Sequence, residues 1–179
     1  MKVFFRIVVF SLAVIGFYTL FAVWYIPRST PGMPPEEKTI LAGPMTMDEF
    51  IANGKGLYSG KGACVLCHNP MGRAPLLDSI AATASGRIKD NRYRGAAANA
   101  EEYIYESMVD PSRYVVAGYG VPGTNDTESP MPDVRSPAVG LNDIEIRAIV
   151  AYLQSIAGVE VTVKAPSDEN HREGINISE

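Results

Sequence analysis

The sequence predicts an all-α protein, in which a small domain of three to five helices follows one membrane-spanning helix at the N-terminus. Two observations carry this prediction. The first is an uncharged and overwhelmingly apolar run at residues 7–26. The second is a set of polar residues with capping-box spacing, each placed ahead of apolar residues at helical intervals. No segment alternates convincingly between apolar and polar residues, so we expect no strand.

Residues 7–26 contain no charged side chain and are long enough to cross a hydrocarbon core of roughly 30 Å as a helix. Lys2 and Arg6 precede them, and an aromatic pair lies at the far end, where amphipathic rings favour the headgroup region. A cleaved signal peptide is the alternative, but its apolar region is normally shorter and ends at a small-residue cleavage site. We see no A-x-A site here and expect an uncleaved anchor at residues 1–26, inserted in the bilayer through residues 7–26, with the N-terminus cytoplasmic.

The composition limits the classes of function. The chain has 179 residues and a net charge of −4, and its lysines and arginines form no run. The length suits one small domain with appendages. The charge gives no reason to expect a nucleic-acid partner.

Two polar segments flank the predicted domain at residues 46–161. Residues 27–45 contain five prolines and no helical period, which favours a stiff, extended spacer. Residues 162–179 are polar and lack aromatic side chains, so we expect a disordered tail. His171 lies in this tail and is a poor candidate for a metal ligand.

Three helices are expected inside the domain, and a pair with capping-box spacing precedes each: Thr46 with Glu49, Asn99 with Glu102, and Asn142 with Glu145. Pro111 is expected to end the second of them. A shorter fourth helix is expected at residues 76–83.

Both cysteines and one of the two histidines lie within five residues, as Cys64, Cys67 and His68. The pattern C-x-x-C-H is the sequence signal for covalent attachment of a c-type haem. Two such thiols can each form a thioether to a haem vinyl group, while the adjacent imidazole binds the iron. We therefore expect one haem c, bound covalently through Cys64 and Cys67, with His68 as an iron ligand.

Three other interpretations of the motif are weaker. A thioredoxin-like redox pair requires a βαβ setting, which the sequence lacks. A structural zinc site requires four ligands, and the only other histidine or cysteine is His171. A disulfide within C-x-x-C closes too small a loop to constrain the chain much.

A haem that only transfers electrons usually keeps both axial positions filled, and a thioether sulfur opposite histidine raises its reduction potential. Met131 lies between Pro130 and Pro132, which fix the backbone and would present the sulfur from a rigid loop. Met108 has the helical spacing of a core residue. We expect Met131 to be the second iron ligand; Met108, another ligand or a vacant site are the alternatives.

The segment from about residue 46 to 161 resembles a class I monohaem cytochrome c of the membrane-anchored bacterial type, similar to the cytochrome domains of respiratory complexes. Four stretches carry the resemblance: GKGLYSGKGACVLCH, RAPLL, EEYIYESMVDPSRYVVAGY with MP following, and LNDIEIRAIVAYLQSI. The resemblance implies that Pro75 offers its carbonyl to the second imidazole nitrogen of His68. It also implies that Gly54 and Tyr58 cross Tyr152.

The resemblance implies that Arg92, Tyr93 and Arg94 lie where such domains often place haem-propionate partners; a solvated surface position is the alternative for each of them. The stretch GVPGTNDTESP at residues 120–130 departs from the family pattern, and we expect it to cover the haem edge or to touch a partner. We expect an apolar haem pocket lined by Leu76, Leu77, Ile80, Tyr103, Ile104, Ile149 and Leu153.

The expected function is one-electron transfer, without catalytic residues, on the periplasmic face of a bacterial cytoplasmic membrane. The expected partners in a respiratory or photosynthetic chain are a quinol-oxidising complex, a terminal oxidase, a dehydrogenase or a photosynthetic centre. A free shuttle and a fixed subunit of an oxidoreductase complex both remain open. The alternatives are a haem-based sensor or small peroxidase with an open sixth site, and a subunit whose haem is purely structural.

Overall fold

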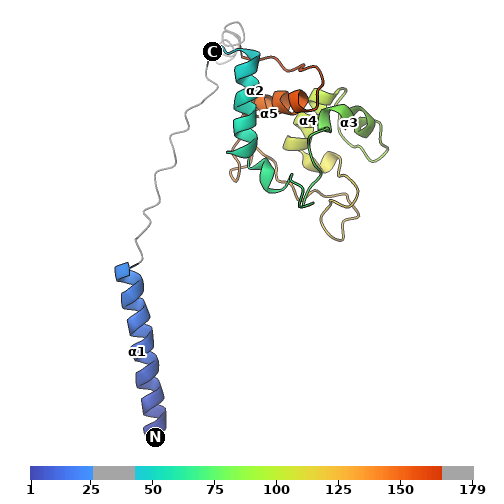
Figure 1. Ribbon diagram of the computed structural model, residues 1–179. Coiled ribbons are helices and arrows are strands. Elements are labelled where there is room, and N and C mark those ends of the chain that lie inside the picture. The colour runs from blue at the N-terminus through green and yellow to red at the C-terminus, as the bar shows by residue number, and fades with distance from the viewer. Residues whose placement is uncertain (26–42, 167–179) are drawn as a thin grey trace, which may run out of the picture. The chain divides into compact units, whose positions relative to one another are not determined.

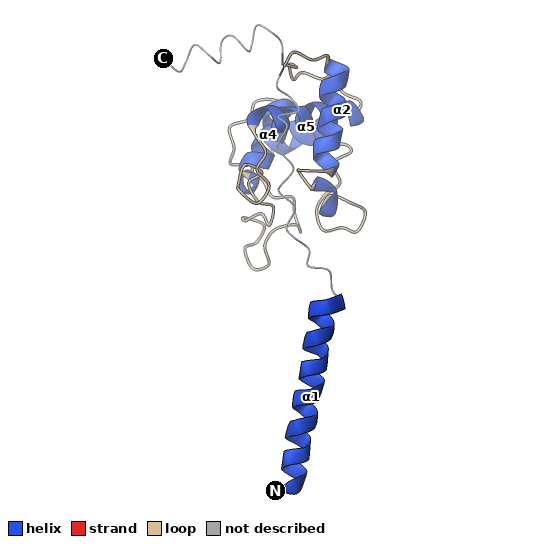
Figure 2. Ribbon diagram, turned by 90° about the vertical axis from the view of Figure 1, so that its left-hand side faces the viewer, coloured by secondary structure: helices blue, strands red, loops and turns tan. Residues whose placement is uncertain are grey.

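Helices are the only regular structure in residues 1–25 and 43–166, the part of the chain that the computed structural model describes, so the all-α prediction is confirmed (Figures 1 and 2). The N-terminal unit holds one helix, α1 (Lys2–Tyr25). The second unit holds α2 (Met47–Ser59), α3 (Ile80–Ile88), α4 (Ala100–Val109) and α5 (Asp143–Ile156), with the 3-10 turns η1 (Cys64–Leu66) and η2 (Pro111–Arg113). Most of the predicted spacer and most of the predicted tail, with His171, lie outside the described residues.

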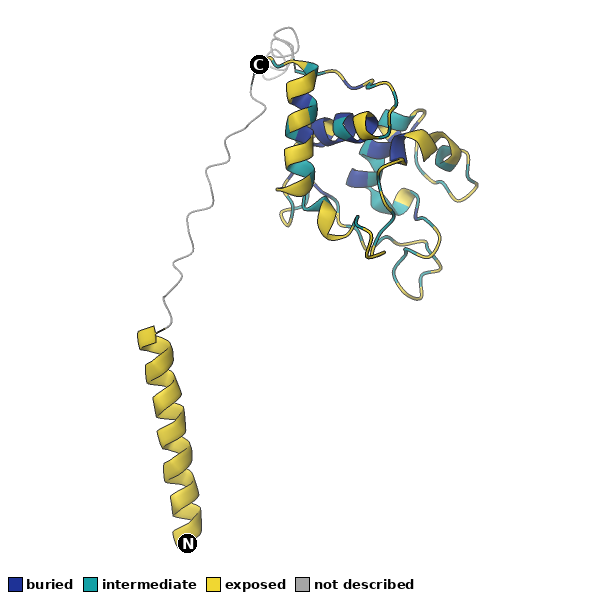
Figure 3. Cartoon of the chain, viewed as in Figure 1, coloured by how far each residue is buried: buried dark blue, intermediate teal, exposed yellow. Residues whose placement is uncertain are grey.

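α1 is a single apolar helix whose whole surface is exposed (Figure 3). Its 24 residues give a length of about 36 Å, which exceeds the hydrocarbon core of about 30 Å. α1 is therefore a candidate single membrane span, as the sequence predicts. A signal sequence near the N-terminus can meet the same criteria of length and apolar composition.

α2 begins at the predicted capping box. The Thr46 hydroxyl accepts the backbone N–H of Glu49 (3.3 Å), and the Glu49 carboxylate accepts the backbone N–H of Thr46 (2.9 Å). This reciprocal pair satisfies two amide donors near the helix start. Phe50 and Gly54 are the buried residues of α2, four apart on one face.

The crossing of α2 and α5 is the most extensive contact between helices in the described residues (Figure 1). A Cβ atom at Gly54 would lie 1.9 Å from the carbonyl oxygen of Ala148, so only glycine permits this approach. Beside it, the rings of Tyr58 and Tyr152 lie 5.5 Å apart between centroids, a distance typical of favourable aromatic pairs. The helix contact that the resemblance implies is therefore present.

α5 forms the centre of the core (Figure 3). Its start is the predicted capping box, in which the Asn142 side chain accepts the N–H of Glu145 and the Glu145 carboxylate accepts the N–H of Asn142, both at 2.9 Å. Helices α2, α3 and α4 all contact it. Because three neighbours cover α5, half of its 14 residues are buried: Ile146, Ala148, Ile149, Val150, Ala151, Leu153 and Gln154.

α4 starts after Asn99 and ends before Pro111, as predicted. The Asn99 side chain accepts the N–H of Glu102 (2.9 Å). The Glu102 carboxylate instead accepts the N–H of Ala98 (2.7 Å) and the Asn99 side-chain amide (2.8 Å), so the cap is a variant of the capping box. The buried residues of α4 are Tyr103, Ile104 and Met108.

The fourth domain helix lies farther along the chain than predicted. We expected residues 76–83, whereas α3 spans Ile80–Ile88. Its first buried positions are Ile80, Ala81 and Ala84. Alanine is a weak apolar signal, and Gly86 lies inside the helix, where a glycine in a sequence lowers confidence that a helix continues.

The packed domain continues past the predicted end at residue 161. Val163 is only 2% exposed. The Thr162 N–H donates to the Gln154 side-chain oxygen (3.2 Å), and the Gln154 amide donates to the Thr162 hydroxyl (2.9 Å). Because the amide of Gln154 is buried and needs partners, residues 162–166 pack on the domain instead of starting the tail.

We predict that Gly54→Ala destabilises the domain by about 1–3 kcal/mol or more, because the new Cβ meets rigid backbone of α5. The matched control is Gly56→Ala in the same helix, where a Cβ meets nothing within 4 Å. That substitution should stabilise the protein by about 0.5–1 kcal/mol, because alanine favours a helix more than glycine does. Chemical denaturation of the haem-loaded protein compares them, and equal stability of the two variants would contradict the proposed contact.

Candidate functional site: the turn that holds Cys64, Cys67 and His68

The C-x-x-C-H residues lie on one tight turn that follows α2. The carbonyl of Cys64 accepts the backbone N–H of Cys67 (3.2 Å) and that of His68 (2.9 Å). Ala63, just before them, has a left-handed backbone (φ 51°), which turns the chain into η1. The structure thus brings both thiols and the imidazole onto one turn.

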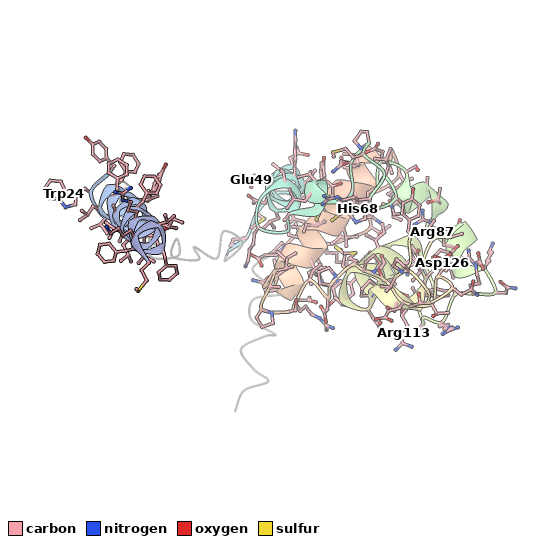
Figure 4. All side chains as sticks on the ribbon, turned by 90° about the horizontal axis from the view of Figure 1, so that it is seen from below. Trp24, Glu49, His68, Arg87, Arg113 and Asp126 are labelled. Atoms are coloured by element: carbon pink, nitrogen blue, oxygen red, sulfur yellow. The ribbon has the colours of Figure 1, made fainter. Side chains whose placement is uncertain are left out.

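The ring of His68 is fixed by Pro75. Its Nδ1 lies 2.7 Å from the carbonyl oxygen of Pro75. Because a carbonyl oxygen only accepts, this hydrogen bond puts the ring proton on Nδ1 and leaves Nε2 with a free lone pair. The contact that the resemblance implies between these two residues is present (Figure 4 labels His68).

The two thiols are free and differ in their surroundings. Cys64 is half-buried and Cys67 is exposed. Burial raises the pKa of the Cys64 thiol to about 11, so this thiol stays protonated at neutral pH. A reactive redox pair needs the opposite, a thiolate with a lowered pKa, which argues against the thioredoxin-like interpretation.

The turn is held close to α5 by packing and by an ion pair. A Cβ at Gly62 would lie 2.9 Å from the carbonyl oxygen of Leu57 and 3.5 Å from the Cδ1 of Ile149. The ammonium group of Lys61 lies 3.0 and 3.1 Å from the two carboxylate oxygens of Glu145, in the first turn of α5. Sequence reasoning did not single out this ion pair, because its partners are 84 residues apart and share no motif.

Met131 lies on an irregular loop between Pro130 and Pro132, half-buried and packed against the core. Met108 is 6% exposed within the core on α4. Met71, close to His68 in sequence, is 81% exposed. Met131 therefore combines a place at the edge of the core with a partly accessible side chain.

Most of the side chains predicted to line a haem pocket belong to the core. Leu77 is partly buried and packs against the core, whereas Leu76 is half exposed. Val65 and Leu66, on the motif turn, are also exposed. The other five predicted lining residues are buried: Ile80, Tyr103, Ile104, Ile149 and Leu153. The domain thus has buried apolar side chains and also exposed apolar side chains that lie close to His68 in the sequence. This combination suits the binding of a large apolar cofactor.

A comparison with protein families identifies the domain that holds this turn. The sequence model of the family described as cytochrome c matches residues 51–157, more than half of the chain. The chain belongs to the cytochrome c family. No curated protein matches the chain at a significant level. The protein is therefore an electron-transfer protein, and its cytochrome c domain implies a covalently bound haem.

The residues of this cytochrome c fit such a haem. Cys64 and Cys67 are free to form two thioethers from one turn. The hydrogen bond to Pro75 leaves one nitrogen of His68 for the iron.

The polar groups of Arg92 and Tyr93 are engaged inside this cytochrome c. The Arg92 guanidinium donates to the Asp90 carboxylate (2.9 and 3.2 Å) and holds the pKa of that carboxyl well below its usual range. The Tyr93 hydroxyl donates to the Glu106 carboxylate. Arg94 is exposed, and its backbone N–H donates a hydrogen bond to a backbone carbonyl of the domain. A role of these three residues toward haem propionates stays a prediction.

The inserted loop at residues 120–130 is organised around Asp126. One carboxylate oxygen accepts the N–H of Gly118 (2.8 Å) and the other that of Gly120 (2.9 Å). These two hydrogen bonds hold the pKa of Asp126 below its usual value. Sequence reasoning did not identify Asp126. The available signal was the Asn125–Asp126 pair, since both residue types tolerate the left-handed backbone that they adopt here.

We predict that Asp126→Asn destabilises this cytochrome c near neutral pH and has no effect in strong acid. The folded-state pKa of Asp126 is lowered, so its stabilisation is present above the unfolded carboxyl pKa of about 3.9 and is lost as pH falls through the folded value. Asparagine also tolerates the left-handed backbone at this position (φ 58°), so the substitution reports on the carboxylate.

The matched control for Asp126→Asn is Glu128→Gln, which removes the same charge from an exposed side chain of the same loop. Denaturation midpoints of the three proteins, measured from pH 7 into strong acid below the folded-state pKa of Asp126, test the prediction. A pH-independent loss in Asp126→Asn, or an equal loss in Glu128→Gln, would contradict this role of Asp126.

Proposed function

We propose that this cytochrome c is a one-electron carrier tethered by α1 to the outer face of a bacterial cytoplasmic membrane. Its haem would be bound through Cys64 and Cys67, with His68 and Met131 as the axial ligands of the iron. The observation that carries the proposal is the 2.7 Å hydrogen bond between His68 and the Pro75 carbonyl, because it orients the imidazole and leaves Nε2 for the iron.

The haem, when bound, supplies a reversible one-electron couple between ferrous and ferric iron. The residues of the chain bind and orient the haem and exclude water from it, and none needs a catalytic role. The Pro75 carbonyl keeps the His68 ring in one tautomer and raises its basicity as a ligand. The buried side chain of Ile149 keeps water out of the core next to the motif turn. Burial and axial ligation together set the reduction potential.

Two features support Met131 over Met108 as the second ligand. Met131 is half-buried on a loop whose prolines restrict the backbone, so its sulfur is available without unpacking a helix. Met108 is part of the core on α4. Withdrawing a methionine side chain from a core position costs about 2–5 kcal/mol, which disfavours its use as a ligand.

The length and composition of α1 support the membrane tether. A tether raises the effective concentration of the haem domain near other membrane proteins, so a small and weak interface suffices for electron exchange. We propose that the partners are redox proteins of a respiratory or photosynthetic chain: a quinol-oxidising complex, a terminal oxidase, a dehydrogenase or a photosynthetic centre.

We predict that Met131→Ala keeps its covalent haem but loses the weak far-red absorption band of iron bound to methionine sulfur. The reduction potential should fall, because a thioether ligand raises it. The reduced variant should bind carbon monoxide. The matched control, Met108→Leu, conserves the volume of a core residue and should keep the band and the potential. Absorption spectra and redox titrations of the purified proteins measure both effects.

An unchanged spectrum in Met131→Ala, with loss of the band in Met108→Leu, would move the ligand to Met108. A wild-type protein that already binds carbon monoxide at neutral pH would instead favour a haem-based sensor or small peroxidase with an open sixth site.

We predict that the mature protein stays in the membrane fraction after a carbonate wash. Mass spectrometry of the intact protein should detect the residues of α1, because an uncleaved anchor keeps them. A soluble haem protein whose mass lacks those residues would identify α1 as a cleaved signal sequence and would contradict the tether.

A further inference from the structure

The segment that carries Met131, residues 129–135, is fixed at its C-terminal end to the last turn of α4. The N–H of Val134 donates to the carbonyl of Met108 (3.1 Å), and Val134 is 3% exposed. The guanidinium of Arg135 donates to a carbonyl in the same turn of α4 (3.2 Å) and pairs with the neighbouring aspartate (2.8 Å). A buried side chain and a bridged guanidinium thus hold this end in place.

Two serine hydroxyls fix the N-terminal end of the same segment. The hydroxyl of Ser112, in η2, accepts the N–H of Ser129 (3.1 Å), and the hydroxyl of Ser129 accepts the N–H of Met131 (3.2 Å). Pro130 and Pro132 have no N–H. The only backbone donors from residue 129 to residue 132 therefore both end on serine hydroxyls.

This end of the segment has a particular need for such contacts. The inserted loop at residues 120–130 directly precedes Met131 and contains turn residues that permit many backbone conformations. Without the hydrogen bond from Ser129 to Ser112, this loop would keep its internal hydrogen bonds, such as that from the Val121 N–H to the Glu128 carbonyl (2.9 Å), but would lose its link to η2 beside Met131. A loop that loses such a link samples more positions, and each position away from the iron weakens a methionine ligand.

We propose that Ser112 and Ser129 are positioning residues for the distal ligand: they hold the backbone of Met131 so that its sulfur stays on the iron when other ligands compete for that position. This inference rests on the proposed ligation by Met131. It adds that the strength of the ligation depends on a hydroxyl 19 residues away in the chain, on a turn that follows α4.

Ser136 supplies a matched control on the same loop. Its hydroxyl oxygen is buried and has no hydrogen-bond partner in the described residues. Ser136→Ala therefore removes the same atom as Ser112→Ala without removing a hydrogen bond. A difference between these two variants reports on the Ser112–Ser129 contact.

The test is the binding of imidazole to the oxidised, haem-loaded protein. Loss of the far-red band is the signal that measures this binding. Imidazole can bind only when Met131 has left the iron, so its apparent Kd varies inversely with the fraction of molecules in that state. Loss of one hydrogen bond shifts such an equilibrium by about 2- to 10-fold. Ser112→Ala should therefore lower the Kd for imidazole by about 2- to 10-fold.

Ser136→Ala should leave the Kd unchanged, and Ser112→Thr, which keeps a hydroxyl, should restore it. In a Met131→Ala background, adding Ser112→Ala should change nothing, because the ligand that Ser112 positions is then absent. An effect of the same size in that background would show that Ser112 acts on the site in general and would overturn the inference.

The outcomes separate the inference from the proposed function beneath it. A wild-type protein without the far-red band would mean that Met131 is not the ligand, and both would fail. A wild-type protein with the band, whose Kd for imidazole is the same in Ser112→Ala, would leave the ligation standing and overturn the positioning role.

Discussion

The close crossing of α2 and α5 at Gly54 is the constraint on which the rest of the domain depends. A side chain at this position would meet the backbone of Ala148, so the two helices approach as closely as they do only because residue 54 is glycine. The chain leaves α2 five residues after Gly54 and enters the motif turn almost at once. The helix contact therefore also decides where Cys64 lies relative to the buried face of α5.

The contacts around the motif turn follow from that constraint. Lys61 meets Glu145, and Gly62 meets Ile149, because the crossing brings the end of α2 near the first turns of α5. The ion pair of Lys61 and Glu145 lies at the edge of the core, whereas Ile149, behind the motif turn, is buried and apolar. Such a division suits a cofactor that is held covalently on one side and covered by apolar side chains on the other. The Pro75 carbonyl supplies the polar contact that the His68 ring needs.

Local patterns in the sequence predicted much of this structure, and contacts between distant residues account for what they missed. The capping residues of α2, α4 and α5 act within four residues, so spacing alone revealed them. α3 was misplaced because its buried face consists partly of alanine, which carries little apolar signal. Residues 162–166 were assigned to the tail because the groups that hold them, among them the buried amide of Gln154 and the backbone N–H of Met45, lie on distant parts of the chain.

The same distinction applies to the candidate site. Cys64, Cys67 and His68 form a local motif and were recognised directly, whereas the contacts of Pro75 and Gly54 were expected only from the resemblance to the cytochrome c family. The Ser112–Ser129 hydrogen bond joins residues 17 apart through a single hydroxyl, and no spacing rule reveals it. Sequence patterns thus predict which residues bind the cofactor, and the three-dimensional structure shows which hydrogen bonds and packing contacts those residues make.

The central claim, that Cys64 and Cys67 hold a haem covalently, is tested most directly by extracting the purified full-length protein with acidified acetone and recording the spectrum of the protein that remains. Thioether bonds survive this treatment, so the account predicts that the haem stays with the protein and that its reduced form has a sharp low-spin spectrum. Haem that passes entirely into the acetone, or protein without haem, would contradict the claim and would return the two cysteines to thiol chemistry.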